Sequence, residues 1–571
     1  MVALVLPVLR LVAGAMLTLF IGAQAVRADS LAVMPPLGAG PYAVGCTNVA
    51  QDFTRVPAGE DVKKYWEGTP NGNTGRYLTS LLSEPSYTLQ LDVAVPDTSS
   101  LYGDFATQHV PYVVLVCYPT SSDNSRPDYA LPTGRAVPHM QRGGEPPLWR
   151  DPNVRYPVLL FGHGLGGSPL SNDYITAQAI FASYGYVTVA PFGGDARFAD
   201  VRIEDFNDAV FALLNFKSFV AMQALRPLSM DLALDQVLAH PDFVGHVDPQ
   251  RIGAFGASLG AESAMLLTGA RLTTTLGQSS QSVLKDPRIS AVVGYVPYFG
   301  QKFYPAFGRD QNGLSGITVP FLGIAGTADT TAPIDVTEEG VRRLGGSRTL
   351  VALNGVQHGF DVASTQDIFT WSLIFLQAHV QNDPLWRARL ARMEKVAGGG
   401  DDRTLIDYTA PSPPAASERL VTEFYRSSKD HYFITAEPAE AALLDAGVQI
   451  TGWSSTGFAF KAWPAGSPNG TATCRFFGTP GIGPDSHLYT NNPAECAMVK
   501  GDRAWTYEGV AFNALPVIGG DCAVDRVPVI RLYNNGRGGE ANHRYTTSRS
   551  EIANTTARGW SVEGPVFCAL P

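Results

Sequence analysis

The sequence of 571 residues is poor in charge and has no block of basic residues. Asp, Glu, Lys and Arg make up 16% of the chain, well below the share that is usual in globular proteins. The formal net charge is −10, so the positive surface that nucleic-acid binding needs is not predicted. A hydrophobic content of 45% is enough to build compact domains and excludes wholesale disorder.

Cysteine is also scarce, and its spacing excludes the common zinc motifs. The six cysteines form no CxxC pair and no cluster with histidine, so we expect neither a metal site nor another cofactor. Their even number fits disulfides formed in an oxidising compartment. We expect each cysteine to pair with its neighbour in the same domain, as Cys46–Cys117, Cys474–Cys496 and Cys522–Cys568.

Apolar runs long enough to cross a bilayer are missing beyond the N-terminus. Residues 1–28 contain an early Arg10, an apolar stretch and small-residue cleavage sites after Ala25 and Ala28. This layout is typical of a secretory signal peptide, with a retained membrane anchor as the alternative. We therefore expect a secreted protein, extracellular or periplasmic, without stable membrane insertion.

Residues 34–396 alternate apolar strands with helical patterns, which predicts one large domain. The expected strands are 87–95, 112–118, 156–162, 186–191, 251–256, 291–298, 320–326 and 348–355. The expected helices are 172–183, 206–238, 259–270, 335–343 and 363–380. Apolar strands that alternate with helices predict an α/β fold, in which helices cover both faces of a mostly parallel sheet. In such a sheet the functional loops lie at the carboxyl ends of the strands.

A segment rich in Gly, Pro and Ser, 397–419, predicts a linker to a second domain. Residues 420–571 contain three repeats that align at a spacing of 56 residues on His431, His487 and His543. Each repeat continues with Thr, Glu, Trp and Gly at similar spacing. The tail is therefore predicted to be a smaller β-rich domain with threefold symmetry.

The three repeated tryptophans, Trp453, Trp505 and Trp560, allow two interpretations. They could form a face that contacts carbohydrate or another polymer. Alternatively, they recur because a symmetric fold needs the same packing residue in each repeat.

The strongest local motif is Gly-Ala-Ser-Leu-Gly at 256–260, between an expected strand and an expected helix. Its small residues permit a sharp turn that presents Ser258 as a nucleophile, whereas the alternative is an ordinary turn serine. A second glycine-rich loop, which begins at His163, ends an earlier strand at the position that donates an N–H to an oxyanion in folds of this kind. We assign the oxyanion donors to the N–H groups of Leu165 and Leu259, and we expect His163 to order its loop rather than act as a base.

Two later strand ends supply an acid and a histidine in the order that a triad of this type requires. Asp329 and His358 each follow an apolar strand. His358 would accept the proton of Ser258, and Asp329 would orient and stabilise the charged imidazole. Asp335 and Asp361 are the alternative acids, although both lie in or beside expected helices.

The motifs GHGLGG, GASLG, GTAD and QHGF occur in this order between residues 156 and 380, and this part of the chain resembles the α/β-hydrolase superfamily. The GHGLGG loop and the opening PPLGAGPYAVGCTNV are similar to bacterial relatives of platelet-activating-factor acetylhydrolase, dienelactone-hydrolase-like esterases and polyester hydrolases. The resemblance implies carboxylic-ester hydrolysis through an acyl-enzyme, on a small-molecule, lipid or polyester substrate. Dienelactone hydrolases carry Cys where this chain has Ser258, which argues against lactone chemistry, and residues 120–150 are an insertion relative to shorter relatives. The repeat tail resembles a module of unknown function on secreted bacterial proteins.

Several alternatives stay open. A lipid-directed esterase or phospholipase A-type acylhydrolase, or a peptidase, would use the same machinery. A non-catalytic polymer- or glycan-binding protein could use the hydrolase domain only as a scaffold. Within that domain, the apolar segment 210–238 is either a cap over the acyl pocket or a set of helices packed on the sheet.

Overall fold

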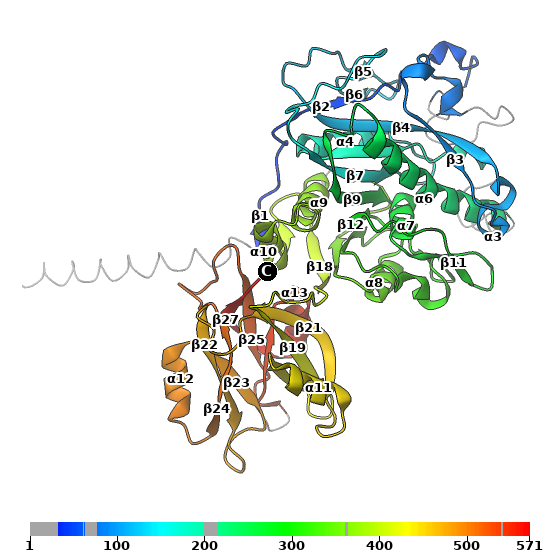
Figure 1. Cartoon of the computed structure of the whole chain (residues 1–571). Helices are drawn as coiled ribbons and strands as arrows, with labels where there is room; N and C mark the ends of the chain where they lie inside the picture. Colours follow the sequence, from blue (N-terminus) through cyan, green and yellow to red (C-terminus); the bar gives the residue numbers. More distant parts are fainter. Residues whose placement is uncertain are drawn as a thin grey trace, which may run out of the picture. The chain divides into compact units, whose positions relative to one another are not determined.

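The computed structural model describes residues 32–60, 62, 65, 77–198, 215–359, 364–537 and 541–571, and the signal-peptide prediction for 1–28 lies outside them. These residues belong to two compact units (Figure 1). The large unit contains Pro36–Arg387 and Gly398–Ala410. The repeat unit contains Pro411–Pro571, Ala388–Ala397 and the described residues up to Pro35, so the chain passes between the units four times.

A ten-stranded sheet runs through the large unit, in the order β18-β16-β15-β12-β9-β7-β8-β4-β2, and β3 pairs with β4 beside this path. The strands are β2 (Ala43–Cys46), β3 (Gln90–Ala94), β4 (His109–Thr120), β7 (Tyr156–Gly162), β8 (Val187–Pro191), β9 (Val247–Ala257), β12 (Ile289–Tyr295), β15 (Phe321–Gly326), β16 (Arg348–Leu353) and β18 (Asp402–Tyr408). The six strands from β16 to β8 are parallel, and the outer pairings are antiparallel. The predicted strands and the α/β arrangement are confirmed, but the sheet is mixed, because only its six central strands are parallel.

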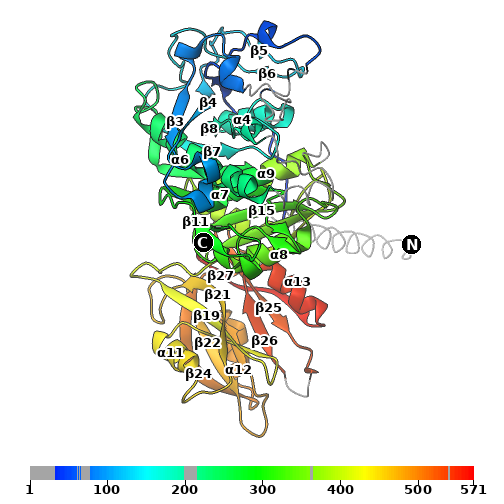
Figure 2. The ribbon, with the colours of Figure 1, turned by 90° about the vertical axis from the view of Figure 1, so that its right-hand side faces the viewer.

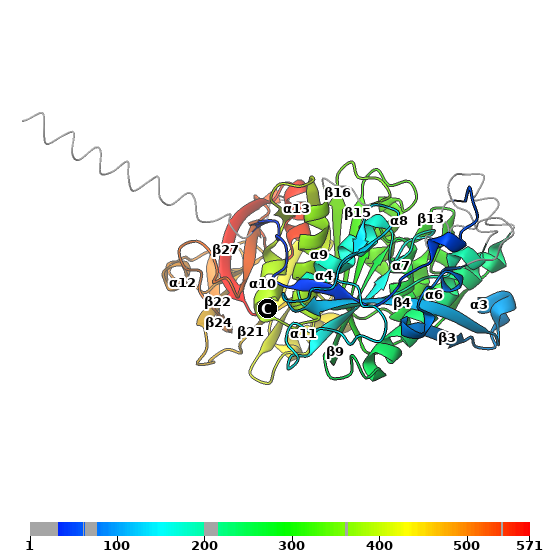
Figure 3. The ribbon, with the colours of Figure 1, turned by 90° about the horizontal axis from the view of Figure 1, so that it is seen from above.

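Helices pack beside the strands of the large unit (Figure 3). The two buried clusters that β4 joins show that they cover both faces of the sheet. The helices are α4 (Asn172–Ser183), α6 (Phe216–Ala239), α7 (Leu259–Leu267), α8 (Ile334–Arg343) and α9 (Thr365–His379). Val114 and Val116 of β4 share a buried cluster with α6, whereas Val113 and Leu115 share one with α4. Because successive strand residues point to opposite faces, α4 and α6 lie on opposite sides of the sheet.

The segment 210–238 is a helix packed on the sheet over its described part. From Phe216 onward it forms α6, which contacts β8 and α7 and buries most of its apolar residues. Residues 210–214 lie outside the described residues. The interpretation of this segment as a core helix is therefore confirmed for 216–238.

The structure differs from the predicted linker 397–419, because residues 402–408 form the edge strand β18. This strand pairs antiparallel with β16 along its whole length. Two buried contacts hold its beginning: the Trp371 indole N–H donates to Asp402 at 2.6 Å, and the Gly400 N–H donates to Asp367 at 2.7 Å. The flanking Gly and Pro residues obscured a short strand, and residues 411–415 carry no helix or strand.

The repeat unit consists of three antiparallel three-stranded sheets, each with one helix (Figure 2). The sheets are β20-β19-β21, β23-β22-β24 and β26-β25-β27. Their strands are β19 (Arg419–Arg426), β20 (His431–Thr435), β21 (Ser454–Ala462), β22 (Thr471–Gly478), β23 (His487–Thr490), β24 (Trp505–Ala514), β25 (Val527–Tyr533), β26 (His543–Thr546) and β27 (Ser561–Ala569). The helices are α11 (Pro438–Ala446), α12 (Pro493–Lys500) and α13 (Arg549–Ala557). One phenylalanine from each sheet meets the other two at ring-centroid distances of 5.5–6.0 Å, namely Phe460, Phe512 and Phe567. The predicted β-rich threefold arrangement is confirmed.

Strand pairing corrects the alignment of the first repeat by one residue. Thr435, Thr490 and Thr546 occupy the same register in the three sheets. Counted back from these threonines, the residue at the place of His487 and His543 in the first repeat is Tyr432. The spacing on His431 was misleading because the first repeat carries an extra residue between histidine and threonine.

Ion pairs connect each repeat to the next. At two boundaries a strand arginine pairs with the helix glutamate of the preceding repeat, as Arg475–Glu440 at 2.9 Å and Arg531–Glu495 at 3.0 Å. At the third boundary Glu423 stands in the register of those arginines. Arg544 pairs with Glu423 at 2.9 Å and with Glu551, the helix glutamate of the third repeat, at 2.8 Å. The third repeat is therefore also connected to the first, through an arginine that bridges two glutamates.

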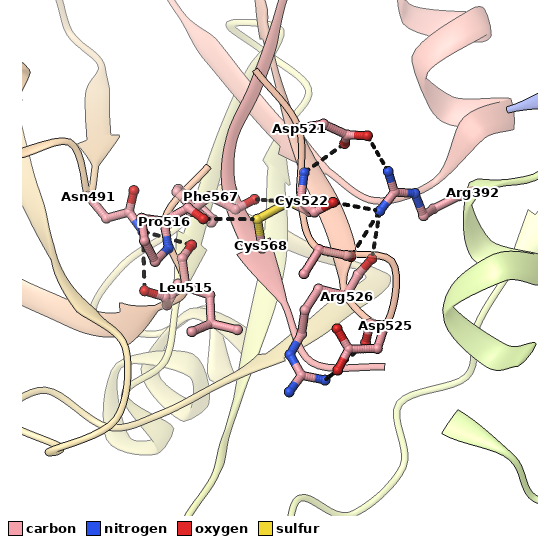
Figure 4. The surroundings of a disulfide bond; sticks show 12 residues. Arg392, Asn491, Leu515, Pro516, Asp521, Cys522, Asp525, Arg526, Phe567 and Cys568 are labelled. Carbon is pink, nitrogen blue, oxygen red and sulfur yellow. Dashed lines mark hydrogen bonds and ion pairs between the residues drawn. A yellow bond between two sulfur atoms is a disulfide. The ribbon is translucent and has the colours of Figure 1, made fainter. Parts of the chain in front are cut away.

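The three disulfides join the pairs of cysteines expected from the sequence. Figure 4 shows the surroundings of Cys522–Cys568, where Arg392 pairs with Asp521 and donates to the backbone carbonyls of Cys522 and Arg526. Arg392 thereby joins the segment 388–397 to the rest of the repeat unit. The disulfides fit an oxidising compartment outside the cytoplasm. Among the described residues, no helix has the length and hydropathy to span a membrane.

Candidate active site

Ser258, Asp329 and His358 come together beyond the carboxyl ends of β9, β15 and β16, which run parallel in one sheet with β12 between β9 and β15. The Nε2 atom of His358 lies 3.0 Å from the Oγ atom of Ser258. The Nδ1 atom of His358 lies 2.8 Å from the Oδ2 atom of Asp329. The Asp329 side chain is fully buried, whereas the His358 side chain is 26% exposed. Solvent therefore reaches the row at the histidine and not at the aspartate.

Ser258 occupies a strained turn between β9 and α7. Its φ is +55° and its ψ is −120°, a backbone conformation that residues other than glycine rarely adopt. The turn leaves no room for side chains at its flanks: a Cβ on Gly256 would lie 2.2 Å from the carbonyl carbon of Gly260. A Cβ on Gly260 would lie 2.0 Å from the carbonyl oxygen of Gly162. The glycines of the motif are thus required by close approach of the backbone, and the interpretation of Ser258 as an ordinary turn residue does not explain the strain.

Backbone hydrogen bonds join the loop of the acid to the loop of the histidine. The N–H of Thr327 donates to the carbonyl of Leu353, and the N–H of Ala328 donates to the carbonyl of Val356, both at 3.0 Å. The Oδ1 atom of Asp329 accepts two further N–H groups of its own loop at 2.8 Å. The carboxylate is therefore fixed before it meets His358.

The glycine loop after β7 lies against Ser258. A Cβ on Gly164 would be 3.4 Å from the Cβ of Ser258. Leu165 follows in this loop, and Leu259 is the first residue of α7, where an N–H has no carbonyl partner within the helix. No described residue accepts a hydrogen bond from the N–H of Leu165 or of Leu259. Leu259 directly follows Ser258, and Leu165 directly follows Gly164, which lies against the Ser258 side chain. The N–H groups of both residues are unpaired within the described part of the chain.

His163 orders this loop, as expected, and is not in the row of catalytic candidates. The N–H of Gly193 donates to its Nε2 atom at 2.7 Å, and its Nδ1 atom lies 2.8 Å from the carbonyl of Gly164. Burial and the nearby charge of Arg226 lower the pKa of His163 to about 4, so the imidazole is neutral.

The alternative acids do not meet the histidine in the described structure. Asp335 begins α8 and pairs with Lys302. Asp361 lies outside the described residues.

Sequence reasoning missed two charged residues beside the glycine loop, Arg226 and Asp195. Both are buried, with 3% and 4% of their surface exposed, and they form an ion pair at 2.9 Å. A signal was present, because an arginine inside an otherwise apolar helical run needs a buried partner. Asp195 follows β8, another strand end, but nothing in the sequence pattern joins it to α6.

A third missed residue, Glu262, lies one helical turn after Ser258. It is fully buried, and its Oε1 atom accepts a hydrogen bond from the side chain of Gln223. Its Oε2 atom has no partner among the described residues. Burial raises the pKa of Glu262 to about 8, so the carboxyl is mostly protonated at neutral pH.

The repeated tryptophans do not form a common face. Trp560 is 2% exposed and packs with Tyr432, whereas Trp453 packs near Phe433 and Trp505 packs in the cluster of the second repeat. Trp560 is therefore a packing residue, whereas Trp453 and Trp505 are half-buried and pack within their own repeats.

The comparisons with known proteins reach only the C-terminal part of the chain. A family described as a domain of unknown function (DUF5648) matches residues 391–515 and 419–570, so the repeat unit is similar to that family. No curated protein matches the chain. Within the described residues, no three His, Cys, Asp or Glu side chains are grouped to hold a metal ion.

Proposed function

We propose that the protein is a secreted serine carboxylic-ester hydrolase with an α/β-hydrolase fold. The observation that carries the proposal is the hydrogen-bonded row of Ser258, His358 and Asp329, with the serine at a strained strand-to-helix turn. A hydroxyl, an imidazole and a buried carboxylate in this order activate a serine for acyl transfer. The disulfides support a location outside the cytoplasm.

The proposed reaction has two steps, acylation of Ser258 and hydrolysis of the acyl-enzyme, and each catalytic group acts in both. Ser258 attacks the ester carbonyl while His358 accepts its proton at Nε2, and Asp329 stabilises the charged imidazole. The N–H groups of Leu165 and Leu259 donate to the oxyanion, each worth about 3 kcal/mol in the transition state. His358 then gives the proton to the leaving alcohol, and a water molecule releases the acid by the same route.

The direct test compares the wild type with Ser258→Ala and a matched control in hydrolysis of nitrophenyl esters. We expect Ser258→Ala to lower kcat by a factor of about 10⁴ or more. Ser372 is a suitable control, because it is also a buried serine whose hydroxyl donates to a helical carbonyl in α9. Equal activity of Ser258→Ala and wild type would contradict the proposal.

Two further measurements separate the proposed function from its rivals. Labelling of Ser258 by a fluorophosphonate, lost in Ser258→Ala, would exclude a non-catalytic scaffold, which needs no activated serine. A series of acyl lengths, a phospholipid, casein and a polyester film would then place the substrate. Faster cleavage of phospholipid or casein than of short esters would replace the proposed class by a phospholipase A-type acylhydrolase or a peptidase.

A contact with carbohydrate or another polymer through the repeat unit is the second part of the proposal. Exposed apolar side chains support it, among them Ile482 and Met498, which are 65% and 69% exposed. Retention of the full chain on chitin, cellulose or polyester film, reduced by Ile482→Ser with Met498→Ser, is the expected result. Unchanged retention in that double variant would contradict a contact at these residues.

A further inference from the structure

Besides the hydrogen bonds between them, the buried side chains of Arg226 and Asp195 also make hydrogen bonds to the backbone of the glycine loop. The Nε and Nη2 atoms of Arg226 bind the two carboxylate oxygens of Asp195 at 3.0 and 2.9 Å. A buried pair is costly unless its remaining donors and acceptors are also satisfied. Burial disfavours the Asp195 carboxylate, yet the charge of Arg226 keeps the pKa of Asp195 below its ordinary value, so both groups are charged.

The remaining bonds of this pair all go to the glycine loop. The Nη1 atom of Arg226 donates to the carbonyl of His163 at 2.8 Å, and Nη2 donates to the carbonyl of Gly164 at 3.1 Å. Asp195 accepts the N–H of Gly166 at 3.0 Å. The hydroxyl of Tyr174 accepts the N–H of Gly164 at 3.1 Å.

These hydrogen bonds involve three successive peptide groups of the loop, 163–164, 164–165 and 165–166, and each group is bound at different atoms. The first, between His163 and Gly164, is bound at both its carbonyl and its N–H. The second is bound at its carbonyl, and the third is bound at its N–H. The N–H left over is that of Leu165, which belongs to the second group. The Gly164 carbonyl also accepts the N–H of Gly167 at 3.3 Å and lies 2.8 Å from the Nδ1 atom of His163, so Arg226 is one of three groups that hold it. In a trans peptide the carbonyl and the N–H point in opposite directions, so by binding this carbonyl Arg226 helps to direct the Leu165 N–H away from itself.

We propose that Arg226, held by Asp195, is the positioning residue that orients the Leu165 N–H toward the oxyanion. This inference rests on the proposed ester hydrolysis. Gly164 already lies against the side chain of Ser258, so a fixed direction of the next N–H sets one of the two oxyanion donors. The planar guanidinium is suited to this task because it binds a carboxylate and two carbonyls at once, which the single ammonium of a lysine cannot do.

The test uses Arg226→Lys in the full chain, with Ser229→Ala as the matched control. Ser229 is buried in the same helix and donates to a helical carbonyl. We expect Arg226→Lys to lower kcat for nitrophenyl butyrate about 10²-fold, as the loss of one oxyanion donor does, with KM changed by less than about threefold. Affinity for a trifluoromethyl ketone, whose adduct with Ser258 carries an oxyanion, should fall by the same factor. Ser229→Ala should match the wild type in all three quantities.

A folded Arg226→Lys protein that keeps its kcat within about threefold, or that loses kcat without losing ketone affinity, would overturn the inference. If Arg226→Lys does not fold, Tyr174→Phe decides, because it removes only the hydroxyl that holds the first peptide group. We then expect about a tenfold loss in both kcat and ketone affinity, and no loss would overturn the inference. An active wild type with unaffected variants refutes this inference alone, whereas a wild type that neither cleaves esters nor labels at Ser258 refutes the proposed function.

Discussion

Replacing Glu262 by glutamine should remove a pH dependence from the stability of the large unit. The carboxyl is fully buried beside Gln223, and its second oxygen has no partner among the described residues. Burial raises the pKa of Glu262 from its ordinary value of 4.5 to about 8 in the folded chain. The folded state therefore favours the protonated form, and ionisation at high pH places an unpaired charge in the core.

The sign and size of the effect follow from the two pKa values. Below pH 4.5 the carboxyl is protonated in both the folded and the unfolded chain, so it does not affect the free energy of unfolding. As the pH rises from 4.5 to 8 the unfolded chain loses its proton and the folded chain keeps it, so stability falls, and the fall ends once the folded carboxyl ionises. Between pH 5 and pH 9 this single group should lower the free energy of unfolding by about 4 kcal/mol.

Equilibrium urea unfolding at pH 5, 7 and 9 measures this difference, for the wild type, Glu262→Gln and an exposed control, Glu339→Gln on α8. We expect the free energy of unfolding of Glu262→Gln to gain about 4 kcal/mol on that of the wild type between pH 5 and pH 9. The control should keep the pH dependence of the wild type. A gain below about 1 kcal/mol would refute the reasoning, since it would mean that Glu262 ionises inside the fold without penalty.

Three other predictions test the site and the supports of the fold. Asp329→Asn should keep the fold but lower kcat about 10⁴-fold in ester hydrolysis, because the amide favours the wrong tautomer of the triad histidine. Arg544→Met should destabilise the repeat unit by about 3–5 kcal/mol in urea unfolding, because it leaves the buried Glu423 without its partner, and Glu423→Gln with Arg544→Met should recover part of that loss. Replacing Cys46 and Cys117 by alanine should lower the stability of the large unit by about 4 kcal/mol, the entropy of freeing a loop of this length, and an unchanged urea midpoint would contradict this estimate.

The row of candidate catalytic residues could be predicted because each member follows a strand whose last residues are apolar and buried. Parallel strands bring their carboxyl ends to one edge, so local patterns at Ser258, Asp329 and His358 were enough to place three distant residues together. The sheet itself was predictable for the same reason. Strands buried on both faces appear in the sequence as continuous apolar runs, which can be recognised without knowing which strands pair with them.

The support of the glycine loop could not be predicted in the same way. Arg226 lies in the middle of α6 and Asp195 begins a short 3-10 helix (Asp195–Arg197), and their meeting depends on how α6 packs over the sheet. The same limit explains the strand β18 in the segment expected to be a linker. This edge strand is half exposed, so its apolar pattern is weak, and the glycines and prolines around it outweighed it.

The path of the chain between the two units changes how the repeat unit should be tested. A truncation before residue 417 would leave behind residues 388–397, although they belong to the repeat unit. Arg392 of this segment is 2% exposed and would lose Asp521 and the carbonyls that it binds. Ala32 and Met34 would stay bound to the same segment, where their carbonyls accept N–H groups of Glu394 and Ala397 at 2.7 and 2.8 Å. In such a truncated chain Arg392 would be unpaired, and residues 388–397 would expose side chains that are normally buried in the repeat unit. Its loss of activity or of polymer binding would report damage to the fold, and surface substitutions in the full chain are the sound test of what the repeat unit binds.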